Sequence, residues 1–228
     1  FEEGFKFYKN YLKIGVSGLI GGCGLGIAMI SFIYSITNTS AAVTLLCLAA
    51  MPFFTALIAF LFLKELISVN VWISIVIATI GIIIMALGNT KESSFVGFIF
   101  GITSSIGFAI FSVSLRWRKE TPKFTTVAVA GLFCFLFATI MILLTDQVFF
   151  ASSYNSSLFS LHGTIVCIGL ILYSIGSKAI PAAELTLLSL TEVIGGIFWV
   201  WLPLFGINEV PDTNTIVGGF FIFISLVY

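Results

Sequence analysis

The stretch YSITNTSAA at residues 34–42 decides the fold, because it returns in altered form as YSIGSKAIPAA at residues 173–183. An apolar run follows each copy, ending at Lys64-Glu65 in the first and at Asn208-Glu209 in the second. The second copy comes five apolar segments after the first. An odd number of crossings turns the copy upside down, and inverted repeats of helices are how many membrane carriers are built. The pattern therefore predicts a transporter.

The composition is that of a membrane protein. Hydrophobic residues make up 59% of the 228 residues and charged residues 9%, against about 25% charged in an average soluble domain. Apolar runs approach the ~20 residues that an α-helix needs to cross the ~30 Å hydrocarbon layer. Eight such segments are predicted, at residues 14–36, 41–63, 70–88, 95–115, 124–145, 159–178, 182–205 and 213–228.

The distribution of positive charge predicts the orientation. If the N-terminal stretch is cytoplasmic, nine of the ten Lys and Arg residues fall on that side and only Lys91 falls on the other. Short cytoplasmic loops of membrane proteins carry an excess of Lys and Arg. We therefore expect a multi-pass protein of the cell inner (plasma) membrane, with the N-terminal stretch and the C-terminus cytoplasmic.

The segments divide into two unequal units. Residues 95–228 supply a complete five-helix unit, whereas residues 1–88 match only the last three helices of a first unit. We therefore expect two further helices before Phe1. The predicted fold class is an all-α polytopic membrane protein, with eight transmembrane helices present of ten, arranged as two inverted five-helix repeats.

Small residues recur at every fourth position in two of the segments. They are Gly18, Gly22 and Gly26 in the first segment, and Gly97, Gly101, Ser105 and Ala109 in the fourth. This spacing places small side chains on one face of a helix and lets a neighbouring backbone approach closely. It predicts tight helix–helix packing rather than a nucleotide-binding loop, since no strand precedes either run.

Glu192 is the leading functional candidate. It lies near the middle of the seventh segment, where a carboxylate costs about 2.5–3.5 kcal/mol on insertion scales. Such a group normally faces the bundle interior or water, and it suits proton exchange or the binding of a cationic group. The alternative is a hydrogen-bonded structural glutamate. At helical spacing Glu192 shares a stripe with Glu184, Leu188, Thr191, Gly195 and Trp199.

Glu184 lies eight residues before Glu192, about 12 Å along a helix axis. The two carboxyl groups are then too far apart to share one proton. Glu184 is either the cytoplasmic mouth of a proton relay or a side chain that extends toward Lys178 and water.

Three further residues are candidates for the wall of a cavity. Pro52 interrupts the second segment near mid-depth, and its break in the helix either faces substrate or only shapes the bundle. Tyr34 and Trp199 are candidate cavity residues, although an aromatic belt at the membrane surface explains them equally well.

The two copies resemble the EamA repeat of the drug/metabolite transporter superfamily. The resemblance rests on residues 38–42, 51–56 and 60–65 in the first copy, and on residues 181–184, 190–193, 199–202 and 208–211 in the second. It implies ten helices, cytoplasmic termini and the movement of small metabolites, often export. On this analogy we expect the first, second, sixth and seventh segments to surround the cavity. Lys64 and Asn208 depart from the pattern, because the family usually has glycine there.

These observations predict a secondary active exporter of small metabolites or drugs, with protons as the candidate coupling ion. The alternative is a non-transporting assembly or sensor subunit whose intramembrane acids hold helices together. No enzymatic activity, cofactor, metal or nucleic-acid partner is predicted, because no ATP-binding motif or reachable catalytic base occurs and the cluster from Arg116 to Lys123 is explained as a topology determinant. Expected partners are a small solute, membrane lipid and, as a candidate, a second copy of the chain.

Overall fold

The computed structural model describes residues 13–39, 44, 47–88, 95–118, 121–145, 152–192, 195 and 213–227. Within these ranges the chain forms helices and turns and contains no strand. The helices are α2 (Gly15–Asn38), α4 (Met51–Ile58), the π-helix η2 (Ala59–Leu63), α5 (Val69–Gly88), α6 (Phe95–Trp117), α7 (Lys123–Thr145), α8 (Ser153–Gly176), α9 (Ala182–Ser189) and α11 (Thr213–Val227). Because η2 continues α4, eight helical segments are present in the part described, as the sequence predicts.

Four of these helices are long and apolar enough to cross a membrane: residues 15–38, 95–117, 123–144 and 153–176. Shorter apolar helical stretches lie at Cys47–Leu63, Val69–Gly81 and Ile216–Ser225. The prediction of an all-helical, multi-pass membrane protein is therefore confirmed, whereas the count of ten helices and the inverted repeat stay predictions.

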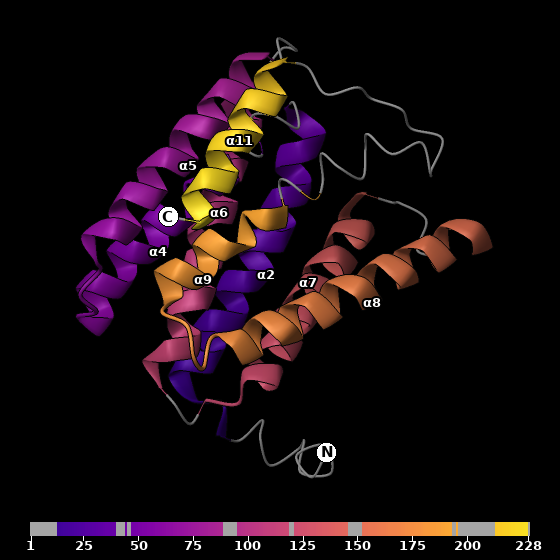
Figure 1. Ribbon diagram of the computed structural model, residues 1–228. Helices are drawn as coiled ribbons and strands as arrows, with labels where there is room; N and C mark the ends of the chain where they lie inside the picture. The colour runs from indigo at the N-terminus through magenta and orange to yellow at the C-terminus, as the bar shows by residue number, and fades with distance from the viewer. Residues whose placement is uncertain are drawn as a thin grey trace.

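The helices pack in two groups that share α6 (Figure 1). In one group α2 lies along α6 and α7, around a core that contains Leu25 and Phe111. In the other group α5 lies along α11, and α4 contacts α6 and α9. The core of the second group includes Ala56, Ile75 and Leu187. In Figure 1, α8 diverges from the bundle along much of its length.

The glycine-rich α2 packs at backbone distance on two neighbours. A Cβ atom added to Gly24 would lie 2.9 Å from the carbonyl oxygen of Gly107 on α6, and one added to Gly107 would lie 2.6 Å from that of Gly24. The face that carries Gly22 and Gly26 packs on α7 instead, against Val129 and Phe133 respectively. The predicted close packing of the small residues is confirmed.

Buried hydroxyl groups connect the same helices. The Ser104 hydroxyl donates to the Ala28 carbonyl oxygen at 2.8 Å, which joins α6 to α2. The neighbouring Ser105 hydroxyl donates to the carbonyl oxygen of Cys47, just before α4. Lipid tails are as apolar as the helix surfaces, so burying apolar side chains adds little to helix association in a membrane. Hydrogen bonds between helices therefore stabilise the bundle together with van der Waals packing.

The start of α8 differs from the prediction. The sixth segment was expected to begin at residue 159, but the helix begins at Ser153. Ser152 caps it by accepting a hydrogen bond from the backbone NH of Asn155. Within the polar first turns, the Ser157 hydroxyl donates to the Ser153 carbonyl oxygen at 3.0 Å. The serines thus bond to the helix itself, so low hydropathy does not mark a loop here.

The end of the α4–η2 segment contains an unfavourable backbone conformation. Lys64 follows the π-helix with φ 55° and ψ 29°, in the left-handed region. Its backbone NH and that of Glu65 both reach the carbonyl oxygen of Ala59. Glycine is the usual residue at such a helix end because it has no Cβ. This geometry explains the glycine expected at position 64 from the family resemblance.

Gly107→Ala is expected to lower the stability of the full-length protein by about 1–3 kcal/mol, because its new methyl group would overlap the backbone of α2. Gly131→Ala is the matched control, since nothing lies within 4 Å of the added Cβ. Thermal unfolding in detergent measures both variants. Equal midpoints would contradict the proposed close packing at Gly107.

Lys64→Gly is expected to raise stability by about 1 kcal/mol, because it removes a Cβ from a left-handed residue. Lys64→Ala is the control, since it removes the same positive charge and keeps the Cβ. Thermal unfolding of the two variants should show a gain for glycine alone. A similar gain for alanine would assign the effect to charge instead of backbone conformation.

Candidate functional site

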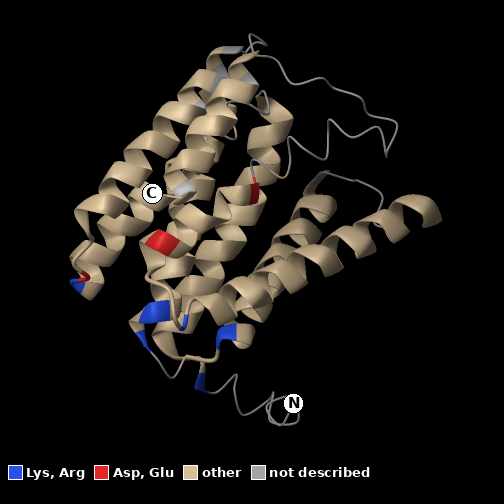
Figure 2. Cartoon of the chain, viewed as in Figure 1, with Lys and Arg blue, Asp and Glu red and all other residues tan. Residues whose placement is uncertain are grey.

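The described positive charges gather at one end of the bundle (Figure 2). This end is formed by the starts of α2 and α7 and by the ends of η2, α6 and α8. The Lys and Arg residues of the described ranges are Lys13, Lys64, Arg116, Arg118, Lys123 and Lys178. We call this the cationic end. The segregation agrees with the charge pattern in the sequence, while the orientation in a particular membrane stays a prediction.

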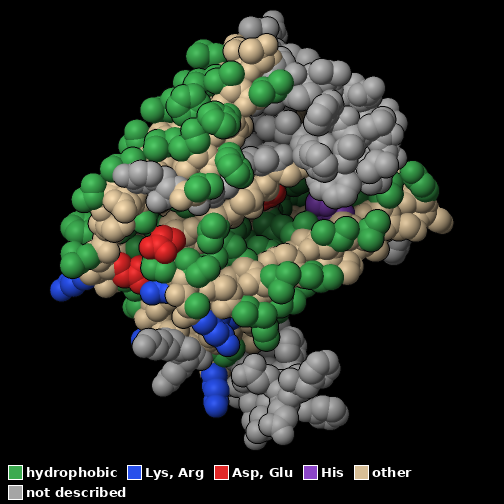
Figure 3. Space-filling view, in the orientation of Figure 1, with side chains coloured by type: hydrophobic (Ala, Val, Ile, Leu, Met, Phe, Trp, Pro, Cys, Tyr) green, Lys and Arg blue, Asp and Glu red, His purple; other side chains and the backbone are tan. Residues whose placement is uncertain are grey.

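One side of α9 is exposed and carries Glu184 and Leu188, whereas Ala183 and Leu187 on the other side belong to the core of the bundle. α9 ends at Ser189 and Leu190 forms a turn, so the helix predicted over residues 182–205 is interrupted here. Thr191 and Glu192 follow this turn and are exposed, and the predicted stripe along one continuous helix stays a prediction. Figure 3 shows the molecule hollowed between α9 and α8, with acidic side chains on the same face of the molecule.

Glu192 is exposed and forms no ion pair with any residue in the described ranges. The adjacent Thr191 hydroxyl donates to the Leu188 carbonyl oxygen at 2.9 Å, so it bonds within its own helix. The functional and the structural interpretations of Glu192 therefore both stay predictions.

The other candidate residues lie elsewhere. Tyr34, near the end of α2 that is remote from the cationic end, stacks on Phe100 of α6 with ring centroids 5.2 Å apart. Pro52 is buried in the first turn of α4, directly after a break at Ala50. The predicted interruption of the helix is present, and its relation to substrate stays a prediction. Trp199 lies outside the described residues.

Arg116 joins the two groups of helices at the cationic end. Its Nε donates to Glu65 Oε1 at 2.8 Å, forming an ion pair between α6 and the loop after η2. Its Nη1 donates to the carbonyl oxygen of Ile180 at 2.8 Å and to that of Ser177 at 3.4 Å, both in the turn between α8 and α9. Sequence analysis assigned Arg116 to membrane topology alone and missed these contacts.

Lys123 fixes the same turn from the start of α7. It is 9% exposed, and its Nζ donates to the Ser177 hydroxyl at 2.8 Å and to the Leu115 carbonyl oxygen at 2.9 Å. The carbonyl groups at the end of α6 have no partners within the helix, so a cation is favourable there. The signal in the sequence was the short polar break between two apolar segments, which places Arg116 and Lys123 close together.

A small cleft lies between the two sides that Arg116 connects. It has a volume of about 90 Å³. One wall comes from the loop after η2 and the start of α5, and the other from the start of α9. Its lining residues are Glu65, Leu66, Ile67, Ser68, Val71, Pro181, Ala183 and Glu184.

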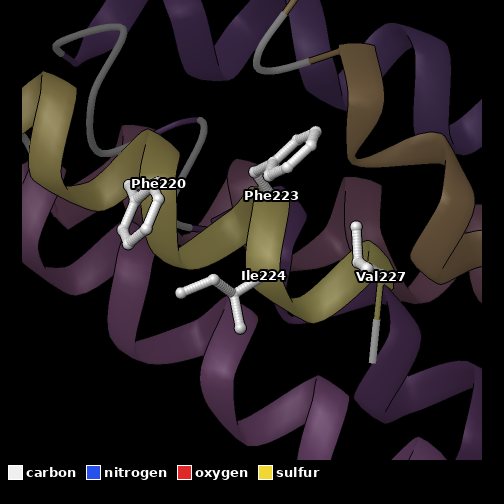
Figure 4. Close-up of a pocket in the computed structure, with 4 residues that line it drawn as sticks. All are labelled: Phe220, Phe223, Ile224 and Val227. Carbon is white, nitrogen blue, oxygen red and sulfur yellow. The ribbon is translucent and has the colours of Figure 1, made fainter.

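A larger groove, on α11, is wholly apolar in its described lining. Phe220, Phe223, Ile224 and Val227 project from this helix (Figure 4), and all four are exposed. Such a surface is typical of a helix that faces lipid. We therefore place the candidate site on the polar stripe of α9 and not in this groove.

Apolar helices of membrane-spanning length, with the Lys and Arg residues of the described ranges at one end, define a multi-pass helical membrane protein. Residues 2–87 match the model of the EamA-like transporter family. The resemblance found in the sequence is thereby confirmed. Family members are transporters and not enzymes.

Two further similarities concern relatives and fold. The chain is 28% identical over 117 residues to an uncharacterized transporter of Helicobacter pylori; the match covers 50% of this chain and 38% of that protein. The chain thus spans well under half the length of this relative. A crystal structure of another protein shares the fold, with a TM-score of 0.68 over 98% of this chain and 82% of the other, at 18% identity.

Lys123→Met is expected to lower stability by about 1–3 kcal/mol, because it leaves the buried Ser177 hydroxyl and Leu115 carbonyl without their donor. Lys178→Met is the control, since Lys178 is exposed at the same end. Chemical or thermal unfolding of the purified full-length protein provides the measurement. If both variants unfold alike, Lys123 has no special structural role.

Proposed function

We propose that the chain is part of a secondary active transporter that exports small metabolites or drugs across the inner membrane, with coupling to protons. The observation that carries the proposal is the position of Glu192, an exposed acid within an apolar segment. An ionisable residue at membrane depth usually marks a solute or proton pathway. The relatives named above support transport as the general activity.

The helix contacts support two inverted units, with residues 1–88 in the first and 95–228 in the second. In such a repeat α4 would correspond to α9 and α5 to α11, and the members of each pair pack on one another. An axis between the units would generate both of these helix contacts.

The surroundings of α8 support a total of ten helices. Its counterpart in the repeat is α2, which packs on α6 and α7 of the other unit. The matching partners of α8 would be the first two helices of the first unit. Only 6% of the apolar stretch of α8 is buried, against 50% for α2. Two additional N-terminal helices would cover α8 and would form the remaining wall of the hollow.

Glu192→Gln in the full-length protein tests the proposed coupling. A solute is first found by screening cells that express the intact gene for export, and its flux is then followed in membrane vesicles across a range of pH. The glutamine variant is expected to lose pH-dependent flux, because an amide neither binds nor releases a proton. Leu188→Gln is the control, since it adds an amide to the same face and retains Glu192.

Unchanged flux with an unchanged pH profile in Glu192→Gln would remove the coupling role. Absence of any solute flux in the full-length protein would favour the alternative, a membrane assembly or sensor subunit.

A further inference from the structure

The cationic end is closed by contacts that cross between the two proposed units. The cleft there has one wall from residues 65–71 and the other from residues 181–184. Arg116 bonds to both sides at once, because it pairs with Glu65 and donates to the carbonyl oxygen of Ile180 directly before Pro181. One side chain therefore bonds to both walls, which also meet where Ile67 and Val71 pack against the core that contains Ala183.

The two sides differ in how firmly they are held. The turn that precedes α9 receives Arg116 and also Lys123, whose partner Ser177 is 1% exposed. The opposite wall is attached to Arg116 through the Glu65 carboxylate, the one ion pair within the described ranges. The two side chains of this pair are 24% and 26% exposed, so water can replace the contact when they separate.

The backbone before Glu65 is suited to movement. The π-helix η2 ends at Leu63, two residues before Glu65, and the intervening Lys64 occupies the left-handed region. π-Helical turns are rare and frequently lie at functional sites. Hinges are commonly a few residues at the end of an element that absorb large changes in φ and ψ. A change at Lys64 would swing the loop that carries Glu65 away from α9.

We infer that Arg116 and Glu65 form a gate at the cationic end, which must open for solute to pass between this end and the α9 stripe. The inference rests on the proposed transport function. Arg116 and Glu65 are positioning residues, since they act by holding the η2–α5 loop against the turn before α9. With the pair formed, the cleft is narrow and Ala183 in its wall is 4% exposed.

Labelling of a cysteine in the cleft wall tests the gate without any substrate. The reporter is Ala183→Cys in the full-length protein with Cys167→Ser, because Cys167 is exposed. The protein is placed in lipid nanodiscs and treated with a water-soluble maleimide, and the same protein without the reporter gives the background rate. Glu65→Gln is expected to raise the labelling rate several-fold. Arg118→Gln is the control, because it removes an exposed cation of the same end.

Arg116→Lys provides a second test if Glu65→Gln fails to fold. Lysine keeps the charge but lacks the planar fork that serves Glu65 and the turn together, so faster labelling is again expected. Unchanged labelling in folded Glu65→Gln or Arg116→Lys protein would overturn the gate, as would an equal increase in Arg118→Gln.

The outcome separates the gate from the transport function. Faster labelling without measurable solute flux in vesicles would retain the gate and reject transport. Flux in the parent protein with unchanged labelling in the variants would retain transport and reject the gate.

Discussion

The close approach of α2 and α6 at Gly24 and Gly107 is the contact from which the rest of the bundle is positioned. Helices in lipid gain little from hiding apolar side chains, so their association depends on close packing and on hydrogen bonds between them. Two glycines facing each other let the backbones approach, and the Ser104 hydroxyl can then reach the Ala28 carbonyl oxygen. Further along α6, Ser105 contacts Cys47 before α4, and Ser112 bonds to Tyr173 of α8 at 2.6 Å.

Small and hydroxylated residues hold these helices together, so charged side chains are not needed for the packing of the helices. The described cations lie at one end, where Lys123 bonds to the Leu115 carbonyl oxygen at the end of α6 and Arg116 pairs with Glu65. Glu192 has no such arrangement within the described ranges. Its counterpart in the proposed repeat is Met51, which is 6% exposed. The same position is therefore packed in one unit and open in the other, as expected if the second unit carries the chemistry.

Helix positions could be predicted well from sequence, because spanning length and hydropathy set them nearly alone. α5, α6 and α7 begin within one residue of the predicted positions. α8 was misjudged because Ser153 and Ser157 lower the local hydropathy while their hydroxyl groups bond within the helix. The exposure of Glu184 and Leu188 on one face of α9 was also predictable, since helical periodicity determines which side chains share a face, whereas the end of α9 at Ser189 was not predicted.

The partner of Arg116 could not be predicted in the same way. Charge counting placed Arg116 and Glu65 at the same end, but contact depends on the rotation and mutual tilt of α6 and η2. Tertiary packing sets both, and neither is encoded in local periodicity.

Once the Gly24–Gly107 contact fixes α2 against α6, the end of α6 has a definite position. Arg116 is then two residues past Ser114, whose side chain would clash with a Cβ added at Gly21, so the rotation of α6 near its cationic end is also constrained. The glycine packing and the Arg116–Glu65 contact thus depend on each other. The glycine packing fixes α6 against α2, and Arg116 at the end of α6 then holds the loop after η2 through Glu65.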